Sequence, residues 1–163
     1  MTISAATSVC IIGSGPAGLL LSQLLANAGI DTIVIDRKDR AYIEARVRAG
    51  ILEQGTVAAL RQAGVADRLD VEGIAHHGLD LAFEGASHHI DIVGLTGKTV
   101  VAYGQTEVTK DLFEKRTDEG GRFYFDVENV DLSGLKSDRP TVRFRHAGQD
   151  VEISCDYIAG CDG

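Results

Sequence analysis

Two short apolar runs flank a stretch with helical spacing in the first 36 residues. Residues 8–12 form an apolar run that ends in glycines, which is typical of a strand buried on both faces of a parallel sheet. Pro16 suits the first turn of a helix, and leucines then recur at helical spacing until Gly29. Residues 32–36 repeat the buried-strand pattern. Residues 8–36 therefore predict a β-α-β unit with a right-handed crossover, and an α/β architecture.

The pattern downstream predicts an excursion from the main sheet and a return to it. Helical spacing predicts a helix over residues 51–63, and alternation over residues 77–83 and 88–92 predicts a hairpin around Glu84 and Gly85. The other predicted elements are a helix over 106–117, a strand over 122–127, a hairpin of 141–146 with 150–155, and a last strand over 156–161. The fold class is α/β, a parallel sheet with an inserted helix and hairpin.

Composition indicates one globular domain. The chain has 163 residues, of which 44% are hydrophobic and 25% charged, the proportions of a soluble protein. No Lys or Arg precedes Arg37, and glycines interrupt the apolar start, so we expect neither a signal peptide nor a membrane span and predict a cytoplasmic protein. Cys10, Cys155 and Cys161 lack metal-ligand spacing and are expected to be small core residues.

The net charge of −8 argues against nucleic acid as a partner, because phosphate binding needs a positive face. One stretch has the opposite balance, with five basic residues against two acidic ones. The basic residues are Arg37, Lys38, Arg40, Arg46 and Arg48, and the acidic ones are Asp39 and Glu44. This stretch is either a seat for a small anionic ligand or a solvated loop.

Neither a metal site nor a catalytic nucleophile is predicted. The pairs His76-His77 and His88-His89 fall on expected strands, where neighbours point to opposite faces and do not converge on one ion. Ser14 stands in a Gly-Ser-Gly sequence, which is not the G-x-S-x-G of a hydrolase. We therefore name no catalytic residue.

The strongest motif is a glycine pattern between the first strand and the first helix. Residues 13–18 read G-S-G-P-A-G and fit the dinucleotide-binding G-x-G-x-x-G. Gly13 permits the tight turn, Gly15 lets the backbone approach a pyrophosphate, and Gly18 lets helix and strand pack closely. The N–H groups near Ala17 then face the anion at the positive end of the helix dipole.

An acidic residue completes the pattern. Asp36 ends the second strand, 18 residues after Gly18, close to the spacing of the acid that accepts ribose hydroxyls. A carboxylate here would repel a 2′-phosphate on the same ribose, so the sequence predicts FAD or NAD at this position. An NAD-dependent dehydrogenase and a nucleotide-binding fragment without turnover both remain open.

Three further segments separate these alternatives. Residues 46–54 (RVRAGILEQ), residues 103–109 (YGQTEVT) and the closing Cys161-Asp162-Gly163 closely resemble the 4-hydroxybenzoate 3-monooxygenase family, in an order that runs through all 163 residues. These are single-component flavin hydroxylases that use FAD, NADPH and oxygen. The resemblance implies a Rossmann-like FAD-binding fold and counts against the dehydrogenase.

The resemblance also assigns cofactor residues. It implies that residues 13–18 and Asp36 hold the ADP half of FAD, that residues 46–51 line the flavin side, and that Gln105 contacts the ribityl and phosphate region. The FAD residues so implied are Gly13, Gly15, Ala17, Gly18, Asp36, Arg46, Val47, Arg48, Ala49, Gly50, Ile51, Gln105, Asp162 and Gly163. Two positions depart from the family: Asp36 replaces its common Glu, and Ala17 replaces its Ser.

NADPH is implied in a groove near the segment after the second strand, without a Rossmann site of its own. Arg37, Tyr42, Arg46 and Arg48 match positions implicated there, and Arg37 would meet the 2′-phosphate, which favours NADPH over NADH. Lys38 and Arg40 depart from the family pattern.

For the complete enzyme, the resemblance implies hydroxylation of 4-hydroxybenzoate to 3,4-dihydroxybenzoate in aromatic catabolism, with molecular oxygen as co-substrate. Residues 1–163 are expected to form the FAD-binding domain, with the substrate domain absent from this chain. A homodimer is compatible with the resemblance. This chain alone is expected to bind FAD weakly and to hydroxylate nothing.

Overall fold

The computed structural model describes residues 2–163, which divide into two compact units. The first unit contains the residues up to Arg46 together with Thr109–Gly163, and the second unit contains Val47–Val108. The chain thus leaves the first unit after its opening elements and returns to it for its last third.

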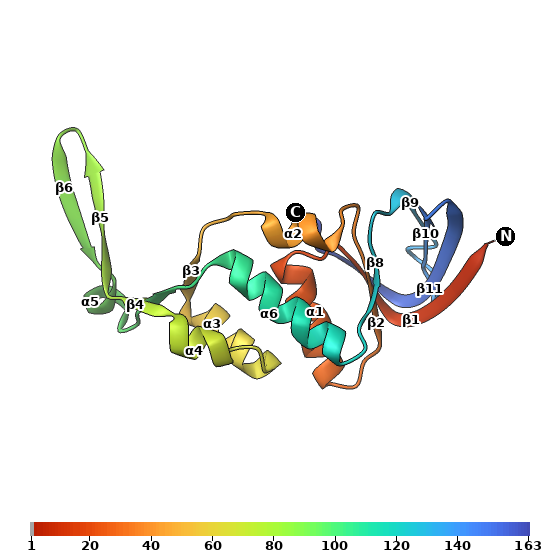
Figure 1. Cartoon of the computed structure of the whole chain (residues 1–163), viewed down its shortest axis with the longest axis horizontal. Coiled ribbons are helices and arrows are strands. Elements are labelled where there is room, and N and C mark those ends of the chain that lie inside the picture. The colour runs from red at the N-terminus through yellow and green to blue at the C-terminus, as the bar shows by residue number, and fades with distance from the viewer. Residues whose placement is uncertain (1) are drawn as a thin grey trace. The chain divides into compact units, whose positions relative to one another are not determined.

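A mainly parallel sheet forms the centre of the first unit (Figure 1). Its six strands within residues 2–163 follow the order β8-β2-β1-β11-β10-β9. β1 runs parallel to β2 and β11, β2 runs parallel to β8, and β10 is antiparallel to both β11 and β9. The strands are β1 (Ile3–Ile12), β2 (Thr32–Ile35), β8 (Arg122–Tyr124), β9 (Glu128–Ser133), β10 (Thr141–His146) and β11 (Gln149–Gly160).

Apolar side chains on both faces of this sheet form the core. On one face, Leu21 and Leu25 of α1 (Pro16–Asn27) pack against a buried cluster. That cluster contains Val9, Ile11 and Val34. A second buried cluster contains Cys10, Ile33, Ile35, Val127, Val142, Phe144, Val151, Ile153 and Cys155. Burial on both faces explains why β1 and β2 read as continuous apolar runs.

A buried polar network joins α1 to α6 (Gln105–Asp118), whose carboxyl-terminal part belongs to the first unit. The Arg116 side chain is 8% exposed, and its Nε donates to Ser22 Oγ at 3.2 Å. Ser22 Oγ lies 2.9 Å from Thr32 Oγ1, and Gln23 Nε2 donates to Glu119 Oε2 at 2.9 Å. The Arg116 guanidinium thus links α6 to α1, and Ser22 extends the link to β2.

The second unit contains two small sheets and three helices within the described chain. One sheet has the order β3-β7-β4, and the other is the hairpin β5-β6. Glu84 and Gly85 turn that hairpin with φ angles of 52° and 76°, as two-residue hairpin loops require. The elements are β3 (Ile51–Glu53), α3 (Gln54–Ala63), α4 (Asp67–Glu72), β4 (Ile74–His76), β5 (Gly78–Phe83), β6 (Ala86–Asp91), α5 (Ile92–Thr96) and β7 (Val100–Ala102).

The α/β fold and the β-α-β unit are confirmed, but several predicted boundaries are wrong. The helix predicted over 51–63 begins at Gln54, because Ile51–Glu53 pairs with β7. The strands predicted over 150–155 and 156–161 are one, since β11 pairs with β10 at its start and with β1 up to Gly160. The strand predicted over 122–127 ends at Tyr124. α2 (Arg40–Ala45) and β9 were not predicted.

His88 and His89 take part in ordinary surface contacts. His88 stacks on Phe83 with ring centroids 4.5 Å apart, while His89 Nδ1 lies 2.9 Å from Asp80 Oδ1. Among residues 2–163, no three His, Cys, Asp or Glu side chains are grouped so as to hold a metal. Within the same range, no helix is long and apolar enough to cross a membrane.

Candidate dinucleotide site

The glycine turn, residues 13–18, passes directly beside the end of β11. Gly13 has a φ of 104°, and a Cβ built on it would lie 2.5 Å from the Cys161 carbonyl oxygen and 2.8 Å from Asp162 N. Cys161 N donates to Ile12 O at 2.7 Å, which fixes this approach. Both the backbone angle and the crowding require glycine at this position.

The other two motif glycines have opposite surroundings. A Cβ on Gly18 would lie 1.9 Å from Gly13 O and 3.2 Å from Ile11 Cγ2, so the start of α1 sits against the turn. A Cβ on Gly15 would have no described atom within 4 Å. Gly13 and Gly18 are therefore needed for internal packing, whereas the space over Gly15 is open to a ligand.

The start of α1 fits an anion. Gly15 is its N-cap residue and Pro16 occupies the first turn, and within the described chain no side chain caps this end and no acidic side chain stands in the first turn. Proline has no N–H to satisfy, so Ala17 and Gly18 carry the N–H groups nearest the positive end of the helix dipole. A phosphate at this point would meet donors without displacing a protein group.

Asp36 lies next to the glycine turn, and its carboxylate accepts hydrogen bonds from this chain. Oδ2 accepts from Ser14 N at 2.7 Å and from Ser14 Oγ at 2.9 Å, and Oδ1 accepts from Lys38 N at 2.9 Å. Its backbone N donates to Tyr124 O at 2.9 Å. The structure thus brings together the acid and the turn, and adds Ser14, which the sequence motif treats as a variable position.

Asp162 and Gly163 follow β11 at the same edge of the sheet. Both are exposed, and Asp162 N lies near Gly13 as described above. Three segments that are distant in sequence, namely the glycine turn, Asp36 and the closing Asp-Gly pair, therefore meet at the carboxyl ends of parallel strands. This is where open α/β sheets bind nucleotides.

The basic stretch after β2 is partly engaged within the protein. Arg40 Nε pairs with Glu44 Oε1 at 2.5 Å, and its guanidinium stands 5.0 Å from the centroid of the Phe113 ring. Lys38 Nζ lies 5.0 Å from the centroid of the Tyr42 ring. Arg37 and Arg46 are exposed, so they are the cations in the first-unit part of this stretch best placed to meet an anionic ligand.

The remaining predicted cofactor residues lie in the second unit. Within this unit, the segment 46–54 contacts the segment 103–109. A Cβ on Gly50 would lie 2.7 Å from Gly104 Cα, and Tyr103 N donates to Gly50 O at 2.7 Å. Ile51 pairs with Ala102 at the start of β3. The other predicted residues here are Val47, Arg48 and Ala49, which are exposed in an irregular stretch, and Gln105, which begins α6.

The thiols of the first unit are not activated. Burial raises the pKa of Cys10 to about 12, and the neighbouring Cys155 adds to the shift. Desolvation, and then the charge of Asp162, also raise the pKa of Cys161. Cys161 is half-buried beside the glycine turn and packs against the cluster of Val9, Ile11 and Val34, so it lies at the edge of the core and not inside it. A thiol with a raised pKa is protonated at neutral pH and is a poor nucleophile.

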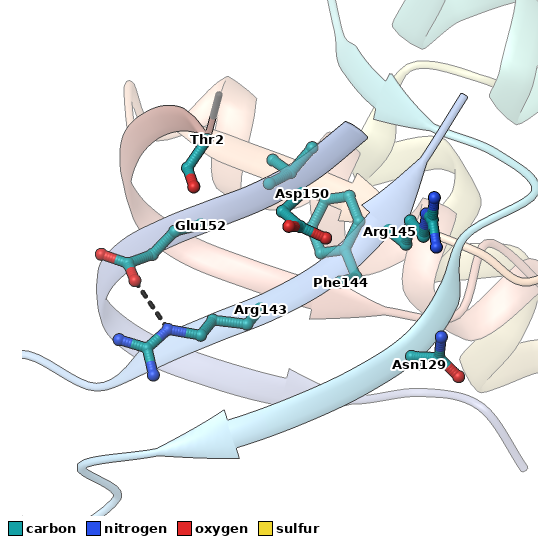
Figure 2. Close-up of a pocket in the computed structure, with 8 residues that line it drawn as sticks. Thr2, Asn129, Arg143, Phe144, Arg145, Asp150 and Glu152 are labelled. Carbon is teal, nitrogen blue, oxygen red and sulfur yellow. Dashed lines mark hydrogen bonds and ion pairs between the residues drawn. The ribbon is translucent and has the colours of Figure 1, made fainter. Parts of the chain in front are cut away.

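A surface hollow of about 360 Å³ lies elsewhere on the first unit, over β10 and β11, and Figure 2 shows the residues that line it. Arg143 Nε donates to Glu152 Oε2 across it at 2.6 Å. It is lined by Thr2, Asn129, Arg143, Phe144, Arg145, Asp150, Val151 and Glu152, none of which is a predicted cofactor residue. An exposed ion pair of this kind is a solvated surface feature.

Comparison with known sequences is consistent with this geometry. The sequence model for the family described as FAD binding domain matches residues 6–163. The chain is 45% identical over 158 residues to p-hydroxybenzoate hydroxylase of Acinetobacter baylyi, covering 96% of this chain and 39% of that protein. It is 28% identical over 166 residues to 3-(3-hydroxy-phenyl)propionate/3-hydroxycinnamic acid hydroxylase of Burkholderia cenocepacia, covering 96% and 30%. The chain spans well under half the length of these relatives.

Solved structures share the fold. The chain superposes on p-nitrophenol 4-monooxygenase PnpA of Pseudomonas putida with a TM-score of 0.80 at 19% identity, covering 99% of this chain and 42% of that one. It superposes on the flavin-dependent monooxygenase PieE, solved in complex with FAD and substrate, with a TM-score of 0.77 at 26% identity, covering 97% and 30%. These superpositions agree with the predicted fold class.

Proposed function

The chain belongs to the FAD binding domain family, and on that premise we propose that its first unit holds the ADP half of FAD. The observation that carries the proposal is the contrast between Gly13 and Gly18, which have no room for a side chain, and Gly15, which faces open space. Internal packing accounts for the first two glycines. Packing does not account for the third, and an approaching pyrophosphate would.

In this proposal each part of the site meets one part of the dinucleotide. The N–H groups of Ala17 and Gly18 hold pyrophosphate oxygens at the uncapped start of α1, and Asp36 accepts a hydrogen bond from the adenosine ribose. Asp162 and Gly163 contact the side chain that links the flavin ring to the phosphates of FAD. The second-unit residues proposed to line the flavin side are Val47, Arg48, Ala49, Gly50, Ile51 and Gln105, with Arg46 at the junction of the two units.

We further propose that the protein works as a flavin-dependent aromatic hydroxylase acting on 4-hydroxybenzoate, with NADPH as reductant and molecular oxygen as co-substrate. The support is its 45% identity to p-hydroxybenzoate hydroxylase of Acinetobacter baylyi. Bound FAD would supply the redox chemistry, and the protein would supply binding, orientation and exclusion of water. Residues 1–163 are proposed as the FAD-binding domain, with substrate contacts from a region equivalent to the unmatched part of that relative.

For NADPH, we propose the exposed segment after β2. Arg37 and Arg46 have free guanidinium groups within the described chain. Tyr42, which lies between them in sequence, is half exposed. A guanidinium binds phosphate oxygens through two parallel donors. Arg37→Ala should therefore raise the Michaelis constant for NADPH more than that for NADH in a complete enzyme, and equal changes would contradict the assignment.

A titration of the purified chain with FAD tests the proposal. Flavin fluorescence should change saturably with one FAD per chain, and ADP should compete. A chain that binds NADH but leaves FAD fluorescence unchanged would instead support the dehydrogenase reading. For the isolated chain we expect no NADPH oxidation coupled to dihydroxybenzoate formation. Finding it would refute the proposal that substrate contacts come from a region outside residues 1–163.

A further inference from the structure

Ser14 is a buried polar residue within the glycine turn, and the motif does not explain it. Its exposed fraction is 0%, so its hydroxyl needs a partner inside the protein. That partner is Asp36, whose Oδ2 accepts from both Ser14 N and Ser14 Oγ. A serine thus directs two donors at the same carboxylate oxygen.

These contacts leave the carboxylate little freedom. A carboxylate has about four acceptor positions, and Ser14 fills two of them on Oδ2, while Lys38 N fills one on Oδ1. The backbone of Asp36 is held as well, because its N donates to Tyr124 O and its carbonyl accepts from Val127 N at 3.1 Å. Oδ1 is therefore the oxygen with an acceptor position left for a ligand.

We propose that Ser14 is a positioning residue of the dinucleotide site. It fixes the Asp36 carboxylate so that Oδ1 accepts a single hydrogen bond from a ribose hydroxyl. The inference rests on the proposed function and adds a residue to it. It also makes the pair interdependent: a longer side chain at position 36 would carry the carboxylate past Ser14 and leave a fully buried hydroxyl without its partner.

Ribose recognition can be measured separately from phosphate recognition by comparing ADP with 2′,3′-dideoxy-ADP in calorimetric titrations of the whole chain. The unmodified chain should prefer ADP by about tenfold, as one hydrogen bond to a charged acceptor provides. Ser14→Ala should reduce this preference to about twofold and leave the dideoxy-ADP affinity unchanged, since phosphate contacts are untouched. Equal weakening of both ligands, or of neither, would overturn the inference.

Ser22→Ala is the matched control. It also removes a fully buried hydroxyl from the first unit, but one that lies outside the site. It should keep the ADP preference of the unmodified chain, and a loss of preference there as large as in Ser14→Ala would show that any buried cavity has this effect. Thermal unfolding followed by circular dichroism reports whether each variant is folded.

A double-mutant cycle tests the interdependence. Asp36→Glu should abolish the ADP preference in the presence of Ser14, and should do less harm in the Ser14→Ala background, with at least about fivefold coupling. Effects that simply multiply would overturn the inference. If Ser14→Ala does not fold, the Asp36→Glu variant alone tests the inference. An undiminished preference of that variant for ADP over dideoxy-ADP would overturn it. Failure of the unmodified chain to bind ADP or FAD would instead remove the dinucleotide site itself, and the inference with it.

Discussion

Substitution of two glycines in the same turn should have opposite effects on stability and on binding. In Gly18→Ala the new Cβ would stand 1.9 Å from the Gly13 carbonyl oxygen, well inside the 3.0 Å that real Cβ contacts respect. The obstacle is backbone, so α1 or the turn must shift. Overpacking usually costs about 1–3 kcal/mol, and we expect at least about 3 kcal/mol here, which lowers the unfolding midpoint by roughly 10 °C for a chain of this size.

Gly15→Ala provides the matched comparison. Its Cβ would meet no described atom within 4 Å, and its φ of −70° suits alanine. The entropic gain of Gly→Ala and the weaker N-cap preference of alanine offset each other, so stability should change by less than about 1 kcal/mol. The methyl group would occupy the approach of the pyrophosphate, and the dissociation constant for FAD should rise at least about tenfold, or about 1.4 kcal/mol.

Thermal unfolding and FAD titration of both variants decide the matter. Gly15→Ala should be stable and bind FAD weakly, whereas Gly18→Ala should be unstable. A Gly15→Ala protein that binds FAD as tightly as the unmodified chain, or a Gly18→Ala protein with an unchanged unfolding midpoint, would refute these roles of the two glycines.

Three further predictions concern the first unit. Arg116→Ala should lower the free energy of unfolding by about 3 kcal/mol, because its buried guanidinium loses hydrogen bonds and packing, whereas the exposed Arg143→Ala should leave the unfolding midpoint nearly unchanged. In a thiol-reagent assay at pH 8, the half-buried Cys161 should react slowly in the native protein because its pKa is raised, while the buried Cys10 and Cys155 should react only after unfolding; reaction of all three thiols in the native protein would contradict the burial. Since the pKa of Cys10 is raised from 9.0 to about 12 on folding, the unfolded state loses this proton first. Stability should therefore fall between pH 9 and 12 by up to about 1.4 kcal/mol per pH unit, and Cys10→Ala should flatten that slope.

The glycine turn could be predicted because its requirements are local. A strand, a tight turn and a helix start leave their marks within a few residues, and the open space over Gly15 and the crowding at Gly18 agree with the roles read from their order in the motif. The proximity of Asp36 followed from the parallel pairing of β1 with β2, which the β-α-β pattern implies.

Other features depend on partners that are distant in sequence. Ile51–Glu53 has helical spacing but becomes a strand because β7, about 50 residues on, pairs with it. β11 continues through Asp156 because β1 pairs with it from Val151 to Gly160, whereas β10 pairs with it only as far as Ser154. Likewise the hydroxyl of Ser14 finds its acceptor 22 residues away. A serine inside a glycine motif, followed by the shorter of the two acids at the ribose position, is the signal that could have indicated this pair.

A crystal structure of the chain with FAD would test the central claim most directly. We predict pyrophosphate oxygens within hydrogen-bonding distance of Ala17 N and Gly18 N, with Gly15 facing them and one ribose hydroxyl on Asp36 Oδ1. A dinucleotide lodged elsewhere, with the start of α1 open to solvent, would contradict the account.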